Sequence, residues 1–319
     1  MVPAGGVEEA TVNAVELQNV TKRFGHQLAV DELSLAVPTG SVYGFIGPNG
    51  SGKTTTLRMI MRIFHPDSGT IHVLGESRTQ AADDRVGYLP EERGLYKAMR
   101  VRDVLRFYAK LKKYTPGRGE IDQWLDRMGL SGAGDKRVNA LSKGMSQKVQ
   151  FIATVISKPQ LVLLDEPFSG LDPVNAAVLR EMVLELRRSG TTVIFSTHDM
   201  SVAEEMCDFI FMIYRGKKVL DGTLKSIQQK YGSDTLHVRA QTNGRGLSDL
   251  PGVLKVTDQG NFQELRLSSG ADSQQILAAL INRGRVDHFE LAHPSLHDIF
   301  VRIASPDPKD ARDAKVSSS

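Results

Sequence analysis

A glycine-rich segment, Gly47–Thr54, has the residue types and spacing of a phosphate-binding loop. It reads G-x-x-x-x-G-K-T, and glycines at these positions let successive backbone N–H groups turn inward towards phosphate oxygens. Lys53 would reach the β- and γ-phosphates, and the Thr54 hydroxyl would be a ligand for Mg²⁺. A chance match in a chain of this length has a probability of about 1%. We therefore expect ATP and Mg²⁺ as ligands, with nucleotide contacts from Gly47, Pro48, Asn49, Gly50, Ser51, Gly52, Lys53, Thr54 and Thr55.

Two adjacent acids, Asp165 and Glu166, follow the apolar run Leu161–Leu164. Asp165 would hold the Mg²⁺ shell, usually through water. Glu166 would point at the water that attacks the γ-phosphorus and act as its general base. Taken alone, such a pair is more often a solvated strand edge, but the phosphate loop reverses that preference. We therefore expect Glu166, together with Lys53, to be catalytic.

Three short apolar runs end where these polar residues begin. Ser41–Ile46 precedes the glycine-rich segment, Leu161–Leu164 precedes the acids, and Thr191–Phe195 precedes Ser196-Thr-His198. A helix is expected over Thr55–Phe64. Apolar strands that alternate with helices predict an α/β fold with a parallel sheet covered on both faces, whose ligands bind outside the carboxyl ends of the strands.

The strand pattern stops between Val101 and Ser157, where apolar residues recur at helical spacing. This predicts a helical subdomain over about residues 100–158, inserted in a domain spanning residues 14–222. Trp124 lies on one of these apolar stripes and is interpreted as core packing.

A change of composition after Gly222 predicts further parts of the chain. Residues 223–232 are interpreted as a connecting helix and residues 233–304 as a small α+β domain. Its expected strands and helices are Thr235–Ala240, Val253–Thr257, Glu264–Leu267, Ser273–Asn282, Val286–Leu291 and a last helix through Ile299–Arg302. Residues 305–319, rich in proline, charge and serine, are expected to be a disordered tail.

Overall composition excludes several classes of protein. The 319 residues carry 40 basic and 37 acidic side chains, a net charge of +3, so no general field favours nucleic acid. The N-terminus lacks the pattern of a secretory signal, and no apolar stretch reaches the ~18 residues of a membrane span. One cysteine, Cys207, fits a reducing compartment. A cytoplasmic location is therefore expected.

The segment Leu141–Met145, Leu-Ser-Lys-Gly-Met, resembles the LSGGQ signature of ABC ATPases, and the order of all motifs from about Ala14 to Gly222 is similar to that family. The resemblance implies a P-loop NTPase fold of the ABC nucleotide-binding type. It also implies that Ser142 and the Gly144 backbone contact the γ-phosphate of ATP bound to an opposite subunit. By the same resemblance Asp172 belongs to the D-loop, His198 is the switch histidine that assists catalysis, and Phe24 stacks on adenine.

Three residues depart from the usual motifs. Lys143 and Met145 replace a glycine and a glutamine of the signature, and Glu91 stands where the family has the Q-loop glutamine. An ionised glutamate accepts hydrogen bonds but cannot donate them, so its contact with the attacking water or with Mg²⁺ would be rearranged.

The segment Gly87–Tyr96 and the C-terminal domain resemble the sodium- and drug-export branch of these ATPases. This implies a separate transmembrane permease as partner, a second copy of the same or a related ATPase subunit, and a peripheral position on the inner face of the cell membrane. The resemblance implies head-to-tail pairing with two composite ATP sites. Alternatives are an ABC ATPase that acts on DNA or ribosomes, a P-loop kinase and a regulatory ATP-binding module.

Overall fold

A computed structural model describes residues 12–76, 84–92, 94–231, 235–242, 246–268 and 270–304. The chain divides between Thr223 and Leu224 into two compact units. The segment 305–319, for which a disordered tail is expected, lies outside the described residues.

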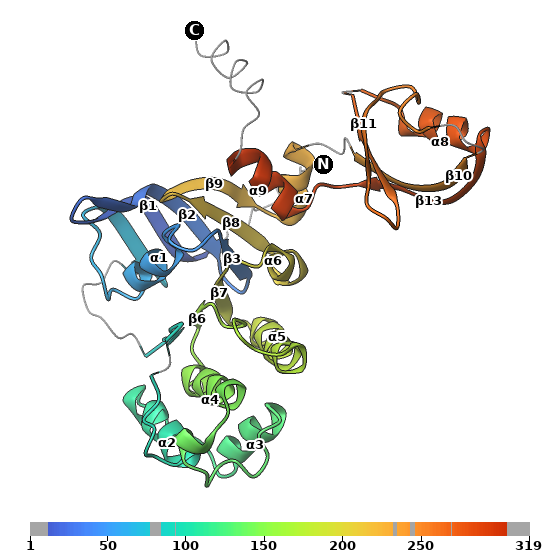
Figure 1. Ribbon diagram of the computed structural model, residues 1–319. Coiled ribbons are helices and arrows are strands. Elements are labelled where there is room, and N and C mark those ends of the chain that lie inside the picture. The colour runs from blue at the N-terminus through green and yellow to red at the C-terminus, as the bar shows by residue number, and fades with distance from the viewer. Residues whose placement is uncertain are drawn as a thin grey trace, which may run out of the picture. The chain divides into compact units, whose positions relative to one another are not determined.

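A six-stranded sheet forms the centre of the first unit, as Figure 1 shows. Its order is β5 (Val86–Leu89), β6 (Leu161–Asp165), β7 (Thr192–Thr197), β3 (Val42–Ile46), β8 (Phe209–Tyr214) and β9 (Lys217–Gly222). All pairs are parallel except the last, because β9 runs antiparallel to β8. The three strands expected from the sequence are β3, β6 and β7, which lie side by side in the order β6-β7-β3. Their carboxyl ends, with the polar residues that follow, therefore meet at one edge.

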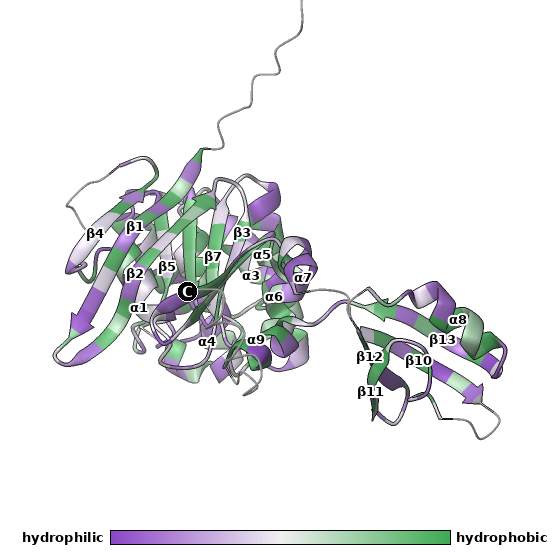
Figure 2. Cartoon of the chain, turned by 90° about the horizontal axis from the view of Figure 1, so that it is seen from above, coloured by the Kyte–Doolittle hydropathy of each residue, from purple (hydrophilic) through white to green (hydrophobic). Residues whose placement is uncertain are grey.

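Both faces of this sheet are buried. Val162, Leu164, Val193 and Phe195 belong to one core cluster, whereas Leu161, Leu163 and Ile194 belong to another, in strict alternation along β6 and β7. Figure 2 shows the resulting hydrophobic character of β3 and β7. The first face packs against α5 (Pro173–Arg188) and α6 (Met200–Met206).

The second face is also covered, as expected, but by a sheet as well as a helix. It packs against α1 (Lys53–Ile60) and a three-stranded antiparallel sheet of order β2-β1-β4. These strands are β1 (Asn13–Phe24), β2 (Gln27–Pro38) and β4 (Ser68–Val73). Their inward residues, such as Val15, Leu17 and Leu33, are fully or almost fully buried, and this burial holds the sheet in place.

Three helices form the subdomain between β5 and β6: α2 (Val101–Leu111), α3 (Glu120–Arg127) and α4 (Lys143–Val155). A 3₁₀ turn, Val138–Ala140, precedes α4. The buried residues of α2 and α3 include Val101, Leu105 and Leu125, and the half-buried side chain of Trp124 packs against the same cluster. Figure 1 shows the subdomain at one end of the unit, connected to the sheet through α4.

The second unit contains α7 (Leu224–Lys230), β10 (Thr235–Thr242), β11 (Val253–Asp258), β12 (Gln263–Leu267), α8 (Ser273–Ile281), β13 (Gly284–Ala292) and α9 (Leu296–Ala304). The strands form an antiparallel sheet of order β11-β12-β10-β13. Ile276 and Leu280 of α8 pack on Leu236 and Leu265 of this sheet. Element ends differ from the expected ones by one or two residues for the strands and for α8.

Helix α7 is anchored within this second unit. Ile227 is buried, the Gln228 side chain donates a 3.2 Å hydrogen bond to the carbonyl of Pro294, and Arg302 of α9 donates one of 3.5 Å to the carbonyl of Tyr231. The segment expected to be only a connector therefore packs as part of the unit that follows it.

Candidate functional site

The glycine-rich loop runs from the end of β3 into α1. Gly47 and Gly52 have φ angles of 150° and 113°, and a Cβ atom would lie 2.2 Å from the carbonyl oxygen of Ile213 at Gly47 and 2.6 Å from that of Ala29 at Gly52. Only glycine fits at such contacts with backbone. Helix α1 begins at Lys53, two residues before the expected start, and ends at Ile60 rather than Phe64. Its N-terminal end, with free N–H groups, therefore points into the loop.

Lys53 is folded over its own loop. Its Nζ atom donates hydrogen bonds to the carbonyls of Gly47, at 2.7 Å, and Pro48, at 3.2 Å, and lies 3.6 Å from Oε1 of Glu166. Only 5% of the Lys53 side chain is exposed. Burial lowers the pKa of Lys53, whereas the charge of Glu166 acts in the opposite direction. This ammonium group is held where an anion bound in the loop would meet it.

Three oxygen atoms connect α1, β6 and β7. The Thr54 hydroxyl donates to Oδ1 of Asp165 at 3.0 Å, and the Ser196 hydroxyl donates to the same oxygen at 2.6 Å. The other carboxylate oxygen, Oδ2, is buried and has no hydrogen-bond partner, as is also true of Oγ of Ser51. A hydroxyl beside a buried carboxylate with a free oxygen is a donor set that suits Mg²⁺, which prefers oxygen ligands and usually keeps several waters.

Glu166 is fixed by its backbone as well as its side chain. Its φ angle of 48° is left-handed, which costs free energy for a residue with a Cβ, and its N–H donates a 2.9 Å hydrogen bond to Oγ of Ser196. Its Oε2 lies 3.0 Å from Nδ1 of the exposed His198, whereas Oε1 is buried without a hydrogen-bond partner. Oε1 makes no hydrogen bond, although it lies 3.6 Å from the Lys53 ammonium, so it is the oxygen available to act as a general base.

Ser196 is a site residue that the sequence analysis did not identify. The only signal was its place in the polar segment Ser196-Thr-His198, directly after the apolar run that ends at Phe195. Its hydroxyl donates to Asp165 and accepts from the N–H of Glu166. One side chain therefore orients both acids.

A cavity of about 450 Å³ opens beside the loop. That volume is in the range of small-ligand sites. Phe24 lies at its edge, is 43% exposed, and makes an edge-to-face contact with Phe64 at 5.2 Å between ring centroids. An exposed ring face suits stacking on a planar base. The cavity is lined by Phe24, Gln27, Ala29, Asn49, Gly50, Gly52, Lys53, Thr54, Thr55, Glu91 and Glu166.

A smaller cavity of about 150 Å³ adjoins the acids. It is lined by Leu89, Pro90, Glu91, Lys143, Gln147, Gln150, Asp165, Glu166 and Ser169. Glu91 and Glu166 line both cavities. The loop after β5 therefore reaches the same acids as the phosphate loop.

Ser142, Gly144 and Asp172 line neither cavity. Ser142 caps α4, because its Oγ accepts a 3.3 Å hydrogen bond from the N–H of Met145, and Asp172 caps α5 by accepting a 3.0 Å bond from the N–H of Asn175. Both side chains are exposed. Within one chain, the structure does not bring these three residues to Lys53.

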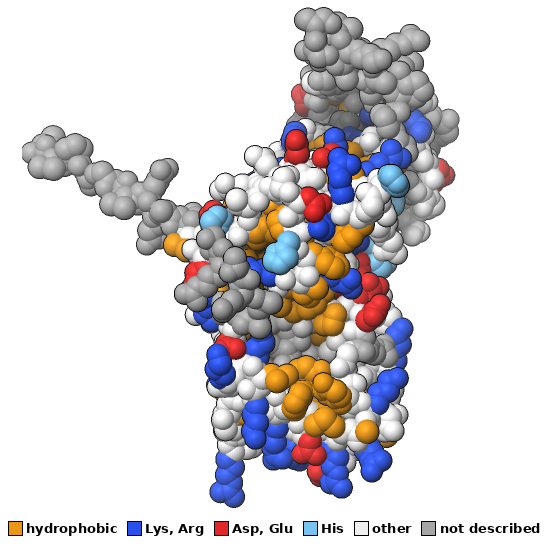
Figure 3. All heavy atoms as spheres, turned by 90° about the vertical axis from the view of Figure 1, so that its left-hand side faces the viewer, with side chains coloured by type: hydrophobic (Ala, Val, Ile, Leu, Met, Phe, Trp, Pro, Cys, Tyr) orange, Lys and Arg blue, Asp and Glu red, His pale blue; other side chains and the backbone are white. Residues whose placement is uncertain are grey.

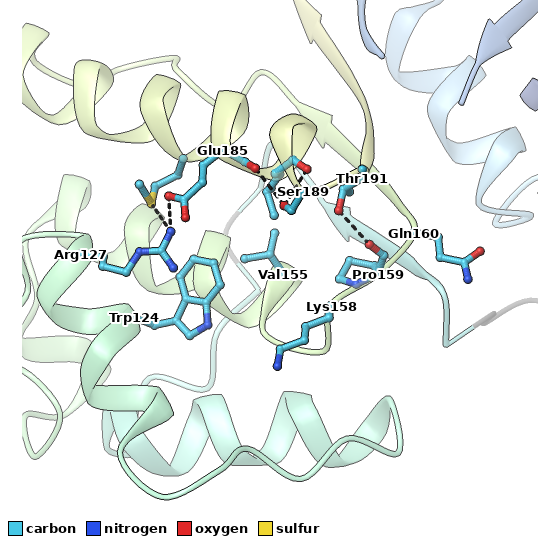
Figure 4. Close-up of a pocket in the computed structure, with 12 residues that line it drawn as sticks. Trp124, Arg127, Val155, Lys158, Pro159, Gln160, Glu185, Ser189 and Thr191 are labelled. Atoms are coloured by element: carbon cyan, nitrogen blue, oxygen red, sulfur yellow. Dashed lines mark hydrogen bonds and ion pairs between the residues drawn. The ribbon is translucent and has the colours of Figure 1, made fainter. Parts of the chain in front are cut away.

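A third cavity, of about 410 Å³, lies between α3 and α5 and is shown in Figure 4. Trp124 forms one wall, and Arg127 extends over the Trp124 ring, 4.6 Å from its centroid, to pair with Glu185. The cavity contains none of the expected site residues.

Neither a ready-made metal cluster nor a membrane-spanning helix occurs in the described part of the chain. No group of three or more His, Cys, Asp and Glu side chains there could hold a metal ion by itself. Across the same residues, every helix is too short or too polar to cross a membrane.

Known proteins match both units. The ABC transporter family matches residues 30–169, and the family described as "ATP-binding protein DrrA1-3-like, C-terminal domain" matches residues 222–304. An uncharacterised ABC transporter ATP-binding protein of Bacillus subtilis, YhaQ, is 41% identical over 89% of this chain and 96% of its own. A Nod factor export ATP-binding protein I of Burkholderia orbicola is 31% identical over 94% of this chain and 100% of its own.

Solved structures agree. A structure titled "Structure of ATP binding subunit of ABC transporter" superposes with a TM-score of 0.63 at 28% identity, covering 69% of this chain and 93% of its own. At lower identity, the fold of the cassette MJ1267 in its ADP conformation matches with a TM-score of 0.58 at 22% identity, covering 68% of this chain and 93% of that one.

Proposed function

The chain belongs to the family of ABC transporter ATP-binding proteins and is an ATPase, and from that premise we propose that it hydrolyses Mg²⁺-bound ATP to drive a separate membrane permease. The observation that carries the proposal is the meeting of Lys53, Thr54, Asp165, Glu166 and His198 at the carboxyl ends of β3, β6 and β7. Each of these five side chains comes from a motif of the expected kind.

Each side chain has a defined part in this proposal. Lys53 leaves the loop carbonyls to bind the β- and γ-phosphates, and Phe24 stacks on adenine. Glu166 accepts the proton of the attacking water, and His198, within hydrogen-bond distance of that carboxylate, orients it. Thr54 and Asp165 would hold Mg²⁺, which when bound offsets the negative charge of the phosphates.

The signature segment implies a second ATPase subunit. Ser142 and Gly144 lie outside the cavity that contains Lys53, and the start of α4 is exposed. A helix N-terminus with free N–H groups binds phosphate, so this end of α4 is suited to the γ-phosphate of a nucleotide on another chain. We therefore infer a head-to-tail dimer with two composite sites, to which Asp172 also contributes.

An aromatic surface supports a permease as the partner. Tyr96, Phe107 and Tyr108 form a cluster with ring centroids 5.4–6.5 Å apart, next to Leu111, and Tyr96 and Leu111 are 54% and 58% exposed. Figure 3 shows hydrophobic side chains gathered on one face over the helical subdomain. Exposed aromatic patches are typical of protein interfaces. Glu91, five residues before Tyr96, would relay contact at this surface to the γ-phosphate.

Export is the direction that the relatives favour. The Burkholderia protein, similar over almost its whole length, is named for export of Nod factor, and the second unit matches a domain of DrrA-like ATP-binding proteins. This supports an export system but does not name the cargo of this chain. Its place would be the inner face of the membrane, held there by the permease.

The experiment that tests this function has two measurements. Purified chain should hydrolyse ATP only with Mg²⁺, and antibody against the chain should recover a transmembrane protein from detergent-solubilised native membranes. The Glu166→Gln chain should recover the same protein without turnover. An ATPase associated instead with ribosomes or DNA would contradict the proposal, and a chain that binds ATP without turnover would favour a regulatory module.

A further inference from the structure

Glu91 and Lys143 line the same cavity of about 150 Å³. Glu91 follows β5, whereas Lys143 is the first residue of α4. Each stands where the resembling family has an uncharged residue, and their charges have opposite sign. We propose that Lys143 is the counter-ion of Glu91 within one chain, a positioning pair that makes a carboxylate at position 91 compatible with ATP. This inference rests on the function proposed above.

The charge balance of the region favours such a partner. Three carboxylates, those of Glu91, Asp165 and Glu166, line the cavity, and all three raise the pKa of Lys53 against the effect of its burial. A bound triphosphate adds further negative charge. Repulsion between Glu91 and the γ-phosphate would weaken ATP binding, and a cation on the cavity wall reduces that repulsion.

The path of the Lys143 side chain agrees with this role. A Cβ atom placed on Gly170 would lie 2.7 Å from Nζ of Lys143 and 3.3 Å from its Cε. The lysine therefore extends from α4 across the turn at Gly170, where φ is +69° and the missing side chain leaves it room. This turn follows Glu166 in the chain, so the ammonium group lies beside the segment that carries Asp165 and Glu166.

The same face of α4 contacts both loops that border the cavity. Gln147 and Gln150 lie four and seven residues after Lys143, a spacing that places all three on one side of a helix. The Gln147 side chain donates to the carbonyl of Pro167, and that of Gln150 donates a 3.3 Å hydrogen bond to the carbonyl of Glu92. An electrostatic interaction of Glu91 with Lys143 across the shared cavity would add to this existing junction between α4 and the loop after β5.

Lys143 could instead act only on the nucleotide of a second chain, as its place in the signature implies. The two roles separate experimentally. A counter-ion of Glu91 affects ATP binding by a single dilute chain and loses its importance when Glu91 is neutral. A residue that contacts phosphate directly keeps its importance in either background.

The test is calorimetric titration of the dilute full-length chain with ATP and with ADP, in EDTA to prevent turnover and dimer formation. Lys143→Gln should weaken ATP binding about tenfold and ADP binding less than twofold, because ADP lacks the γ-phosphate. Glu91→Gln should bind ATP at least as tightly as the parent. The double variant should return to within threefold of Glu91→Gln, a non-additive result that marks a coupled pair.

Two further variants complete the design. Lys143→Arg keeps the charge and should stay within threefold of the parent, and Lys110→Gln, which removes an exposed lysine from α2 of the same subdomain, should match the parent. The inference is overturned if Lys143→Gln binds ATP like the parent, or if its defect persists beside Glu91→Gln. A parent chain that binds no ATP would refute the proposed function itself, and this inference with it.

Discussion

Nδ1 of His198 lies 3.0 Å from Oε2 of Glu166, within the distance of a hydrogen bond. His198 is exposed and the Glu166 side chain is 8% exposed, so the contact joins a solvent-facing ring to a buried carboxylate. The two residues follow neighbouring parallel strands, β7 and β6. The register of these strands therefore sets the geometry of the contact between His198 and Glu166.

Glu166→Gln should abolish turnover and preserve ATP binding. The amide keeps the shape and the contact with His198 but cannot accept a proton, and loss of general-base catalysis typically costs a factor of about 10²–10⁴. Phosphate release and ATP affinity measured on the same preparation check this. Glu181→Gln, which changes an exposed acid of α5 paired with Arg188, is the matched control and should retain parental turnover. Turnover of the Glu166 variant within twofold of the parent would exclude Glu166 as the base.

His198→Ala should lower the turnover number about tenfold or more while ATP affinity changes little, because the ring acts on Glu166 and not on the loop that binds phosphate. Steady-state kinetics separate the two effects. His65→Ala, at an exposed histidine after α1, is the control. Equal losses of turnover in the two alanine variants would argue against a specific role for His198.

Lys53→Ala should reduce ATP affinity at least tenfold, since hydrogen bonds to charged groups contribute about 1.5–3 kcal/mol. The structure adds a second effect, because the carbonyls of Gly47 and Pro48 lose their donor. Calorimetry with ATP, together with thermal unfolding of the apo chain, distinguishes lost affinity from a damaged loop. Unchanged ATP affinity would contradict the role of Lys53.

Ending the chain after Thr223 should leave ATP binding intact, because every expected nucleotide contact precedes that residue. Ending it after Tyr231 should give a less soluble product. That version keeps α7, which carries the buried Ile227, but removes the Pro294 carbonyl and Arg302, so this segment loses the hydrogen bonds that anchor it. Gel filtration and ATP titration of both versions test the boundary. Loss of ATP binding by a folded Thr223 version would place part of the site in the second unit.

Mixing two inactive variants should restore one composite site. Lys53→Ala and Ser142→Arg homodimers each carry a defect in both sites, whereas a mixed dimer has one site with both defects and one with none. That intact site should trap ATP in the presence of vanadate and Mg²⁺. Trapping is measured for each variant alone and for the mixture, with mixed dimers demonstrated by two different tags. No gain in the mixture would contradict the head-to-tail arrangement.

Motif order and strand ends were the parts that sequence could predict. The apolar runs before Gly47, Asp165 and Ser196 became neighbouring strands because continuous apolar runs are typical of parallel strands buried on both faces. The sheet formed by β1, β2 and β4 was not predicted, because β-bulges break the alternation along β1 and its partner β4 follows only after β3 and α1 in the sequence. Ser196 was missed for a related reason, since its partners come from β6.

The roles of Ser142, Gly144 and Asp172 stay predictions, because a single chain does not contain the surface they would meet. The shared cavity of Glu91 and Lys143 was also beyond the sequence. Neither spacing nor residue type relates a loop after one strand to the start of a later helix, whereas packing does.

Arg127 and Glu185 connect α3 to α5 through an ion pair whose side chains are both more than a third exposed. Exposed pairs of this kind contribute about 0–1 kcal/mol, close to thermal energy, and salt weakens them further. On the other side of the subdomain, Val149 and Phe151 of α4 are completely buried. The subdomain is therefore attached firmly through the buried side chains of α4 and only weakly through the ion pair between α3 and α5. Its stiffness should fall as ionic strength rises.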